Sequence, residues 1–239
     1  MKILWAGGAV SVVIPWPGWY NNAVRQNYAS LRGALGGITM KQPKIAVVFH
    51  SVCGNTFLLA RQYQKSLEAL GAQVSLLRLY DPNYAVTGDA FASSRAYKDA
   101  ITAVPLLESP AQVLDCDALF LGSPTYFGNV SAPVKVFMDS FVDYWVEARL
   151  AGKWFGGFAT AGTPYGGADL CLLALNLFAQ HMGMVSVSVP STVTGSIQPA
   201  YGIAHYSGDL SDRRPGPGEE EAVATYCAHV LKLMGAAQA

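Results

Sequence analysis

The sequence predicts an α/β protein in which a doubly wound, five-stranded parallel sheet carries helices on both faces. Short apolar runs typical of buried parallel strands alternate with segments of helical periodicity along the 239-residue chain. Three of these runs end in loops rich in Ser, Thr, Gly and Asn. No internal repeat and no change of composition divides the chain after Met40, so we expect one domain over residues 40–239.

The first half of this domain is expected to contain three strands, at residues 45–49, 73–79 and 117–122. After the first strand, apolar residues recur at helical spacing: Leu59, Tyr63, Leu67 and Leu70. Gly71 ends this helix. Residues 81–111 are mixed and turn-rich, so we expect a loop there with one short helix around residues 95–102.

The second half is expected to add two strands, at residues 154–160 and 184–189, and three helices. Ser131 caps the first helix and Pro133 fits its first turn. The second helix, residues 169–182, is apolar nearly all round and is therefore expected to be buried. A loop rich in Gly and Pro, residues 191–218, leads to a last amphipathic helix. Its apolar face comprises Val223, Tyr226, Cys227, Val230, Leu231 and Met234.

Composition excludes several classes of protein. With 51% hydrophobic residues the chain is not a disordered protein, and 16 basic against 16 acidic residues with no basic run argue against nucleic acid as a partner. No stretch of 18 uninterrupted apolar residues predicts a membrane span. Four scattered cysteines without a CxxC pair or a His at ligand spacing indicate free thiols, no metal site and a cytoplasmic protein.

The segment before Met40 has a different character. Residues 3–16 resemble a short signal-peptide core, but two glycines and Pro15 interrupt it and no small-residue cleavage site follows closely. Met40 leads directly into the first strand, as a natural N-terminus would. We therefore expect residues 1–39 to be an extension from a start assigned too far upstream, with an export signal as the alternative.

Ligands of doubly wound proteins bind beyond the carboxyl ends of the strands, where the first loop, residues 51–56, precedes a helix. The unpaired N–H groups and the dipole at a helix N-terminus favour an anion, and the Ser51 and Thr56 hydroxyls and the Asn55 amide add neutral donors. The loop has no Lys or Arg, and the chain has no GxxxxGK[ST] motif. One phosphate monoester therefore fits better than a nucleoside triphosphate, and a plain strand-to-helix turn is the alternative.

The other two loops suit a flat ligand. Residues 124–129 place Tyr126 and Phe127 beside Gly128, although aromatic residues at a strand end commonly pack into the core. Residues 160–167 contain three glycines that allow a ligand to approach the backbone closely, or that simply form a flexible connector. A phosphate cradle together with two loops for a planar ring describes a flavin mononucleotide (FMN) site.

These loops also carry a family resemblance. Ser51-x-x-Gly54-Asn55-Thr56 after a strand resembles the flavodoxin phosphate loop, and residues 122–131 resemble the flavin-ring loop of the WrbA-like NAD(P)H:quinone oxidoreductases. The resemblance runs in order from about residue 44 to residue 234. It continues through Phe137-Met138-Asp139, Trp145, Gly152-Lys153, Gly162-Thr163, Gly166-Gly167, His181-x-Gly183-Met184 and Tyr201-Gly202. It implies a flavodoxin-like fold and an enzyme that transfers two electrons from NAD(P)H through FMN to a quinone, in ping-pong order.

The resemblance also implies roles for individual residues. The flavin phosphate would be held by Ser51, Val52, Cys53, Gly54, Asn55 and Thr56. The isoalloxazine and ribityl groups would be held by Thr125, Tyr126, Phe127, Thr160, Ala161, Gly162, Thr163, Pro164 and Tyr165. His181 would close the flavin pocket, often that of a neighbouring subunit, and Trp145 would lie near the quinone; without the resemblance, both would be assigned to packing or capping. The family forms tetramers, so a homo-oligomer is expected. No catalytic side chain is assigned, because the flavin carries the chemistry.

Several positions depart from the family pattern. Cys53 replaces a common aromatic residue, Tyr126 a frequent Arg, and Pro164-Tyr165 a Gly-Gly pair, and Pro164 has no N–H to offer the flavin. Two other functions therefore stay open: a flavodoxin-type single-electron carrier and a non-catalytic flavin-binding regulatory protein. Electron carriers gain from a strongly charged face, so zero net charge favours the enzyme. The physiological acceptor and the choice between NADH and NADPH also stay open.

Overall fold

The computed structural model describes residues 42–236, so the expectations for residues 1–39 lie outside the described residues. The strands are β1 (Lys44–Phe49), β2 (Gln73–Arg78), β3 (Ala118–Tyr126), β4 (Asn129–Val130), β5 (Trp154–Ala161), β6 (Val185–Ser186) and β7 (Ile203–Tyr206). The helices are α2 (Asn55–Ala69), α3 (Tyr84–Ala90), α4 (Ala92–Arg95), α5 (Lys98–Thr102), the 3₁₀ helix η1 (Pro110–Val113), α6 (Ala132–Asp139), α7 (Val142–Val146), α8 (Ala168–His181) and α9 (Pro217–Ala236).

The sheet has the strand order β2-β1-β3-β5-β6, and all of these neighbours are parallel. The fifth place is shared by two short strands. β6 pairs with the start of β5, where Phe155 faces Ser186, and β7 pairs with its end, where Phe158 faces Ile203. The predicted five-stranded parallel sheet is confirmed, with its last strand interrupted by residues 187–202. The short strand β4 adds an antiparallel pairing at the end of β3.

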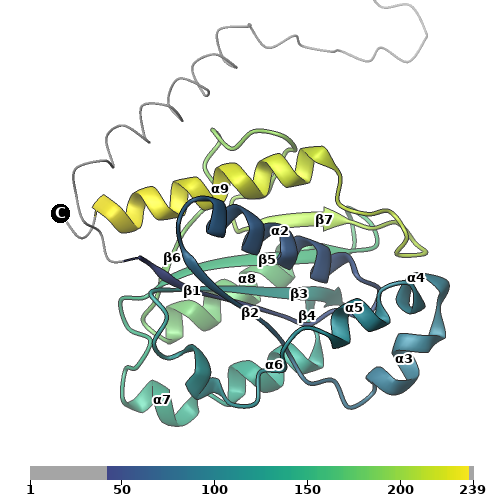
Figure 1. The fold of residues 1–239 in the computed structure, drawn as a ribbon, viewed down its shortest axis with the longest axis horizontal. Helices are drawn as coiled ribbons and strands as arrows, with labels where there is room; N and C mark the ends of the chain where they lie inside the picture. Colours follow the sequence, from purple (N-terminus) through teal and green to yellow (C-terminus); the bar gives the residue numbers. More distant parts are fainter. Residues whose placement is uncertain (1–41, 237–239) are drawn as a thin grey trace, which may run out of the picture. The chain divides into compact units, whose positions relative to one another are not determined.

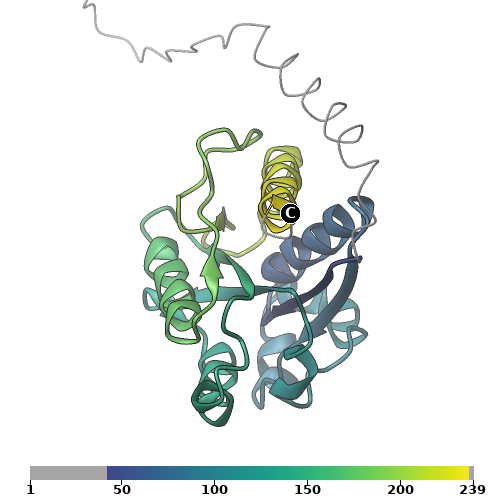
Figure 2. The same cartoon turned by 90° about the vertical axis from the view of Figure 1, so that its left-hand side faces the viewer.

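Helices cover both faces of this sheet, as predicted. Figures 1 and 2 show α2 and α9 on one face and α6 and α8 on the other. On the first face, Tyr63 of α2 and Tyr226 of α9 pack against Phe120 and Phe158 of the sheet, and all four side chains are buried. Their rings lie at centroid distances of 4.8 to 6.5 Å, which suits edge-to-face and tilted contacts.

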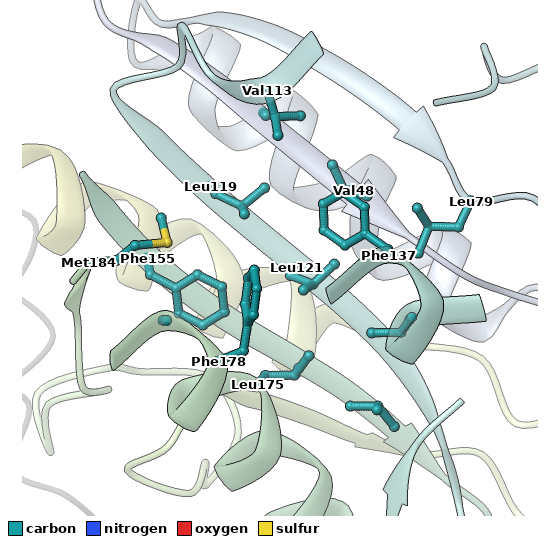
Figure 3. Packing of buried hydrophobic residues seen from close by; sticks show 14 of the residues in the cluster. Val48, Leu79, Val113, Leu119, Leu121, Phe137, Phe155, Leu175, Phe178 and Met184 are labelled. Atoms are coloured by element: carbon teal, nitrogen blue, oxygen red, sulfur yellow. The ribbon is translucent and has the colours of Figure 1, made fainter. Parts of the chain in front are cut away.

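The second face has an aliphatic and aromatic core beneath α6 and α8 (Figure 3). Leu119 and Leu121 of β3 meet Phe137 of α6 and Leu175 and Phe178 of α8. Full burial of each such side chain stabilises the fold by about 1.5 to 3 kcal/mol. The two cores hold the strands in register, and the register fixes where the loops at the strand ends lie.

Four local expectations need correction. Residues 81–111 form α3, α4, α5 and η1 instead of one short helix, because segments of four to seven residues are too short to show a clear period. β7 lies inside the predicted loop 191–218, where only four residues pair. β3 runs on through the first residues of the predicted ring loop as far as Tyr126. The helix α8 is buried only on its inner side, because its outer side exposes Leu170, Leu173 and Leu177.

Other expectations are confirmed. Ser131 occupies the N-cap of α6, although its hydroxyl does not cap the helix, and Gly71 follows α2 with a positive φ of 92°. All four cysteines are free. Between residues 42 and 236, no helix is long and apolar enough to cross a membrane.

Candidate functional site

The three predicted loops meet at the carboxyl ends of β1, β3 and β5 around a cavity of about 100 Å³. It is lined by Ser51, Val52, Cys53, Asn55, Thr56, Pro124, Thr125, Tyr126, Thr160, Ala161, Gly162, Ser207 and Ser211. Ser207 and Ser211 belong to a fourth segment, after β7, that the sequence did not single out. A larger groove of about 560 Å³ runs along the outer side of α2 and contains none of the predicted residues, so size alone does not locate the site.

The first loop has the backbone arrangement of an anion site. Gly54, directly before α2, adopts the left-handed conformation with φ of 91°. Within the described part of the chain, the backbone N–H groups of residues 52–57 have no acceptor, and the first bonded one is the Leu58 N–H, which donates to the Gly54 carbonyl at 2.9 Å. Unpaired N–H groups at the positive end of a helix dipole attract a phosphate. The residues present therefore fit the phosphate of FMN.

Side chains lock this loop to its neighbours. The hydroxyls of Thr56 and Thr160 are hydrogen-bonded at 2.9 Å, which joins the start of α2 to the end of β5. The amide of Asn55 faces the segment after β7, because its Nδ2 donates to the Ser211 carbonyl and its Oδ1 accepts from Arg214. The sequence predicted the side-chain amide of Asn55 as a donor to an anion. Because this amide is already bonded, Asn55 offers its backbone N–H to an anion more readily.

The second and third loops provide one orphaned polar atom and several exposed rings. Thr125 lines the cavity, and its buried hydroxyl has no oxygen or nitrogen partner among the described residues, although it lies beside the Cys171 thiol. A buried hydroxyl without a partner fits a polar ligand atom. Tyr126 is half exposed, and Phe127 and Tyr165 are almost fully exposed, so these rings do not pack into the core.

Two glycines bring these loops together. Gly167 has φ of 81°, and a Cβ on it would lie 2.7 Å from the Cα of Gly128. Only a glycine allows this approach of one backbone to the other. Of the residues predicted to hold the flavin, Gly54, Phe127, Thr163, Pro164 and Tyr165 lie in these loops without lining the cavity itself.

His181 and Trp145 are not brought to the cavity of their own chain. His181 ends α8, which starts beside Gly128 and extends about 20 Å for its 14 residues. Trp145 is exposed on α7, which lies at the same amino-terminal end of the sheet (Figure 1). Both side chains are exposed, and they lie at the amino-terminal ends of the strands, opposite to the end that forms the cavity.

Sequence reasoning missed a buried polar network behind the first loop. His50 follows β1, with its Nδ1 2.9 Å from the Ser131 hydroxyl and its Nε2 3.2 Å from the Asp81 carboxylate. Burial lowers the pKa of His50, and Asp81 opposes this shift in part. The order resembles a hydrolytic Ser-His-Asp set, but Ser131 is fully buried and also bonded to Ser123. The network therefore ties strand ends together and offers no nucleophile.

The family follows from a comparison of the sequence with known families. The model of the family described as NADPH-dependent FMN reductase matches residues 43–197. The chain belongs to this family. Membership confirms the predicted enzyme, an FMN-dependent oxidoreductase that works with a reduced nicotinamide nucleotide.

Curated relatives match at moderate identity. A protein named NAD(P)H dehydrogenase (quinone) 3 from Rhizobium meliloti is 28% identical over 204 residues, covering 82% of this chain and 93% of the relative. An NAD(P)H dehydrogenase (quinone) from Archaeoglobus fulgidus is 32% identical over 149 residues, covering 62% of this chain and 76% of the relative.

Solved structures confirm the flavodoxin-like fold. A flavodoxin, WrbA-like protein from Agrobacterium tumefaciens superposes with a TM-score of 0.54 at 23% identity, over 80% of this chain and 97% of that one. Flavodoxin 2 from Bacillus cereus superposes with a TM-score of 0.53 at 17% identity, over 80% of this chain and 99% of that one.

Proposed function

We propose that this family member transfers two electrons from NAD(P)H to a quinone-type acceptor, with FMN held at the cavity. The set of unpaired N–H groups in residues 52–57, next to the orphaned Thr125 hydroxyl, carries the proposal. The names of the relatives support quinone as the acceptor. In the overall reaction NAD(P)H, a proton and the quinone give NAD(P)⁺ and the hydroquinone, and in our proposal the oxidised nucleotide leaves before the quinone binds.

The residues divide into two groups in this proposal. Residues 51–56 hold the phosphate of FMN, and residues 125–127 and 160–165 hold its ribityl chain and ring. When bound, FMN supplies the hydride acceptor and the two-electron donor of the reaction. The protein binds and orients: Thr125 offers a hydroxyl, and the exposed rings of Tyr126, Phe127 and Tyr165 offer apolar surface to a flat substrate.

We further propose that the active form is a homo-oligomer in which the site is completed by a neighbouring subunit. The outer side of α8 presents Leu170, Leu173 and Leu177, and an exposed apolar stripe of this kind is typical of an interface. Because His181 and Trp145 lie far from the cavity of their own chain, they would serve the cavity of a neighbour. A cytoplasmic location, supported by four cysteines without pairing, and a domain spanning residues 40–239 complete the proposal.

A spectrum and an anaerobic assay of the purified chain test this proposal. We expect bound FMN, and NAD(P)H oxidation that proceeds only when benzoquinone is added. A one-electron-reduced flavin that persists without oxidation of NAD(P)H would instead support the electron carrier. A colourless protein that does not bind added FMN would support the regulatory function and would contradict the enzyme.

A further inference from the structure

Arg214 reaches the loop of residues 51–56, the proposed phosphate loop, from the segment between β7 and α9. Its Nη1 donates to the Cys53 carbonyl at 2.6 Å and to Asn55 Oδ1 at 3.1 Å, and it also meets the Ser211 carbonyl at 3.1 Å. The sequence places no Lys or Arg within residues 51–56, so this guanidinium brings a positive charge against the loop from 160 residues further along the chain. Sequence reasoning gave no signal for it.

The other side of the guanidinium is held by α4 and by the turn between α4 and α5. Its carbon lies 4.4 Å from the centroid of the Tyr97 ring, and Nη2 lies 3.4 Å from the Ser93 carbonyl. The same Tyr97 ring fills the space next to Gly54, where a Cβ would lie 2.5 Å from its Cγ. Arg214 and Tyr97 therefore pack against each other, and both contact the loop.

The segment that carries Arg214 is itself anchored. The fully buried His205 of β7 bonds Glu219 of α9 through Nδ1 at 3.1 Å and the Arg213 carbonyl through Nε2 at 2.9 Å. Glu219 also accepts from the Gly216 N–H at 3.2 Å. Because both flanks of Arg214 are tied to the sheet and to α9, its side chain approaches the loop from a defined direction.

The contact with the Cys53 carbonyl has a consequence for the next N–H group. A trans peptide is planar, and its C=O and N–H point in opposite directions. Holding the Cys53 carbonyl on Arg214 therefore fixes the Gly54 N–H to point away from Arg214. Since Arg214 does not line the cavity, it acts on a ligand through the orientation of this peptide and through its charge.

We propose that Arg214 is the positioning residue of the phosphate loop, and that it strengthens binding of the phosphate group of FMN without touching it. This inference rests on the proposed function, because it takes FMN as the ligand of the cavity. Its distinguishing consequence is a difference between two ligands. The loss of Arg214 weakens the binding of FMN, which carries the phosphate, and leaves the binding of riboflavin, which lacks the phosphate, nearly unchanged.

The experiment compares FMN and riboflavin on the flavin-free full-length chain by quenching of flavin fluorescence. For Arg214→Gln we expect the Kd of FMN to rise about 10- to 100-fold, the range of a lost charge-assisted hydrogen bond, and that of riboflavin by less than about threefold. Arg214→Lys keeps the charge and loses the planar fork of the guanidinium. Its affinity for FMN should therefore lie between those of the wild type and Arg214→Gln.

Arg213→Gln is the matched control. Arg213 carries the same charge in the same segment, its side chain is 62% exposed, and its one ion pair with a residue in the described part of the chain is a 3.5 Å contact with Glu219. Both ligands should bind this variant as they bind the wild type. Thermal unfolding of each flavin-free protein shows whether a variant is folded.

Each result separates the two proposals. Equal losses of FMN and riboflavin affinity in Arg214→Gln, or no loss of FMN affinity, overturn the inference while the wild type still binds FMN. A wild type that binds no FMN overturns the proposed function and the inference with it. If Arg214→Gln does not fold, the same comparison in Arg214→Lys decides: weakened FMN with unchanged riboflavin supports the positioning residue, and unchanged FMN contradicts it.

Discussion

Substitution of Gly54 by Ala tests whether the phosphate loop is shaped by Tyr97. Gly54 and Gly71 have nearly the same positive φ, 91° and 92°, but different surroundings. A Cβ on Gly54 would meet the Tyr97 ring at 2.5 Å, whereas a Cβ on Gly71 would meet nothing within 4 Å. The two substitutions therefore share the cost of a left-handed alanine and differ in the steric contact.

The magnitudes follow from this comparison. A left-handed alanine costs about 1 to 2 kcal/mol at either site. Forcing a methyl group into a packed space adds about 1 to 3 kcal/mol. Gly71→Ala should therefore lower the free energy of unfolding by about 1 to 2 kcal/mol, and Gly54→Ala by about 2 to 5 kcal/mol. The loss of chain entropy in the unfolded state is the same for both and cancels in the difference.

Urea denaturation of the flavin-free chain measures both values, with an unchanged m-value as the sign that only stability has changed. The double variant Gly54→Ala with Tyr97→Ala should lose less stability than the sum of the losses of the two single variants, because the obstructing ring is gone. A Gly54→Ala variant as stable as Gly71→Ala would refute the steric argument. So would a double variant whose destabilisation is the simple sum of the two single changes.

Three further predictions concern other parts of the site. Burial lowers the pKa of His50 from its usual 6.5, so the unfolded chain binds a proton more readily than the folded one and stability falls as the pH drops below 6.5. His50→Gln should reduce this loss of stability in urea titrations between pH 7 and pH 5. A variant whose stability changes with pH as that of the wild type does would contradict this prediction. Thr125→Val should change the stability of the flavin-free protein little, because the hydroxyl has no oxygen or nitrogen partner and lies beside only the weakly accepting Cys171 thiol. It should weaken the binding of FMN about three- to tenfold by fluorescence titration, and unchanged affinity would remove Thr125 from the site. Leu173→Glu with Leu177→Glu should shift the oligomer to smaller species in light scattering at unchanged helix content, and an unchanged mass would exclude this side of α8 as the interface.

The sequence predicted the parts of the fold whose signal is local and repeated. The strands were recognised as short apolar runs, α2 and α9 by apolar residues at helical spacing, and α8 by its nearly continuous apolar character. β7 was missed because it pairs over only four residues and includes the polar His205, which is buried on its hydrogen bonds to Glu219 and Arg213. Its assignment as a strand depends on a pairing with β5, some 40 residues away, that no local pattern reveals.

The meeting of the three loops was predictable to the same degree. The phosphate loop and the two ring loops each carry a compact motif, and the topology of the sheet brings them together at one edge. Arg214 and His50 were missed for a common reason. Each contributes through partners 30 to 160 residues distant, such as Asp81 for His50 and Cys53 for Arg214, so neither has a local motif. The local motifs that point to the candidate site reflect backbone chemistry. The side chains that support this site act through contacts with residues distant in the sequence.

The outer position of the sheet next to β5 is divided between β6 and β7, and the two strands have different roles. β6 closes the edge near the start of β5, and β7 carries the chain to Ser207, Ser211 and Arg214 beside the cavity. Residues 187–202 between them are pinned at their ends, where the Val187 N–H bonds Phe155 and the Val189 N–H bonds Ala200. Gln198 inside this segment accepts the Ala204 N–H of β7, and Gly195 and Gly202 pack closely against other backbone, so only exposed positions such as Ile197 can change without disturbing β7. These exposed positions give the protein a place to acquire new surface while the geometry around the cavity stays constant.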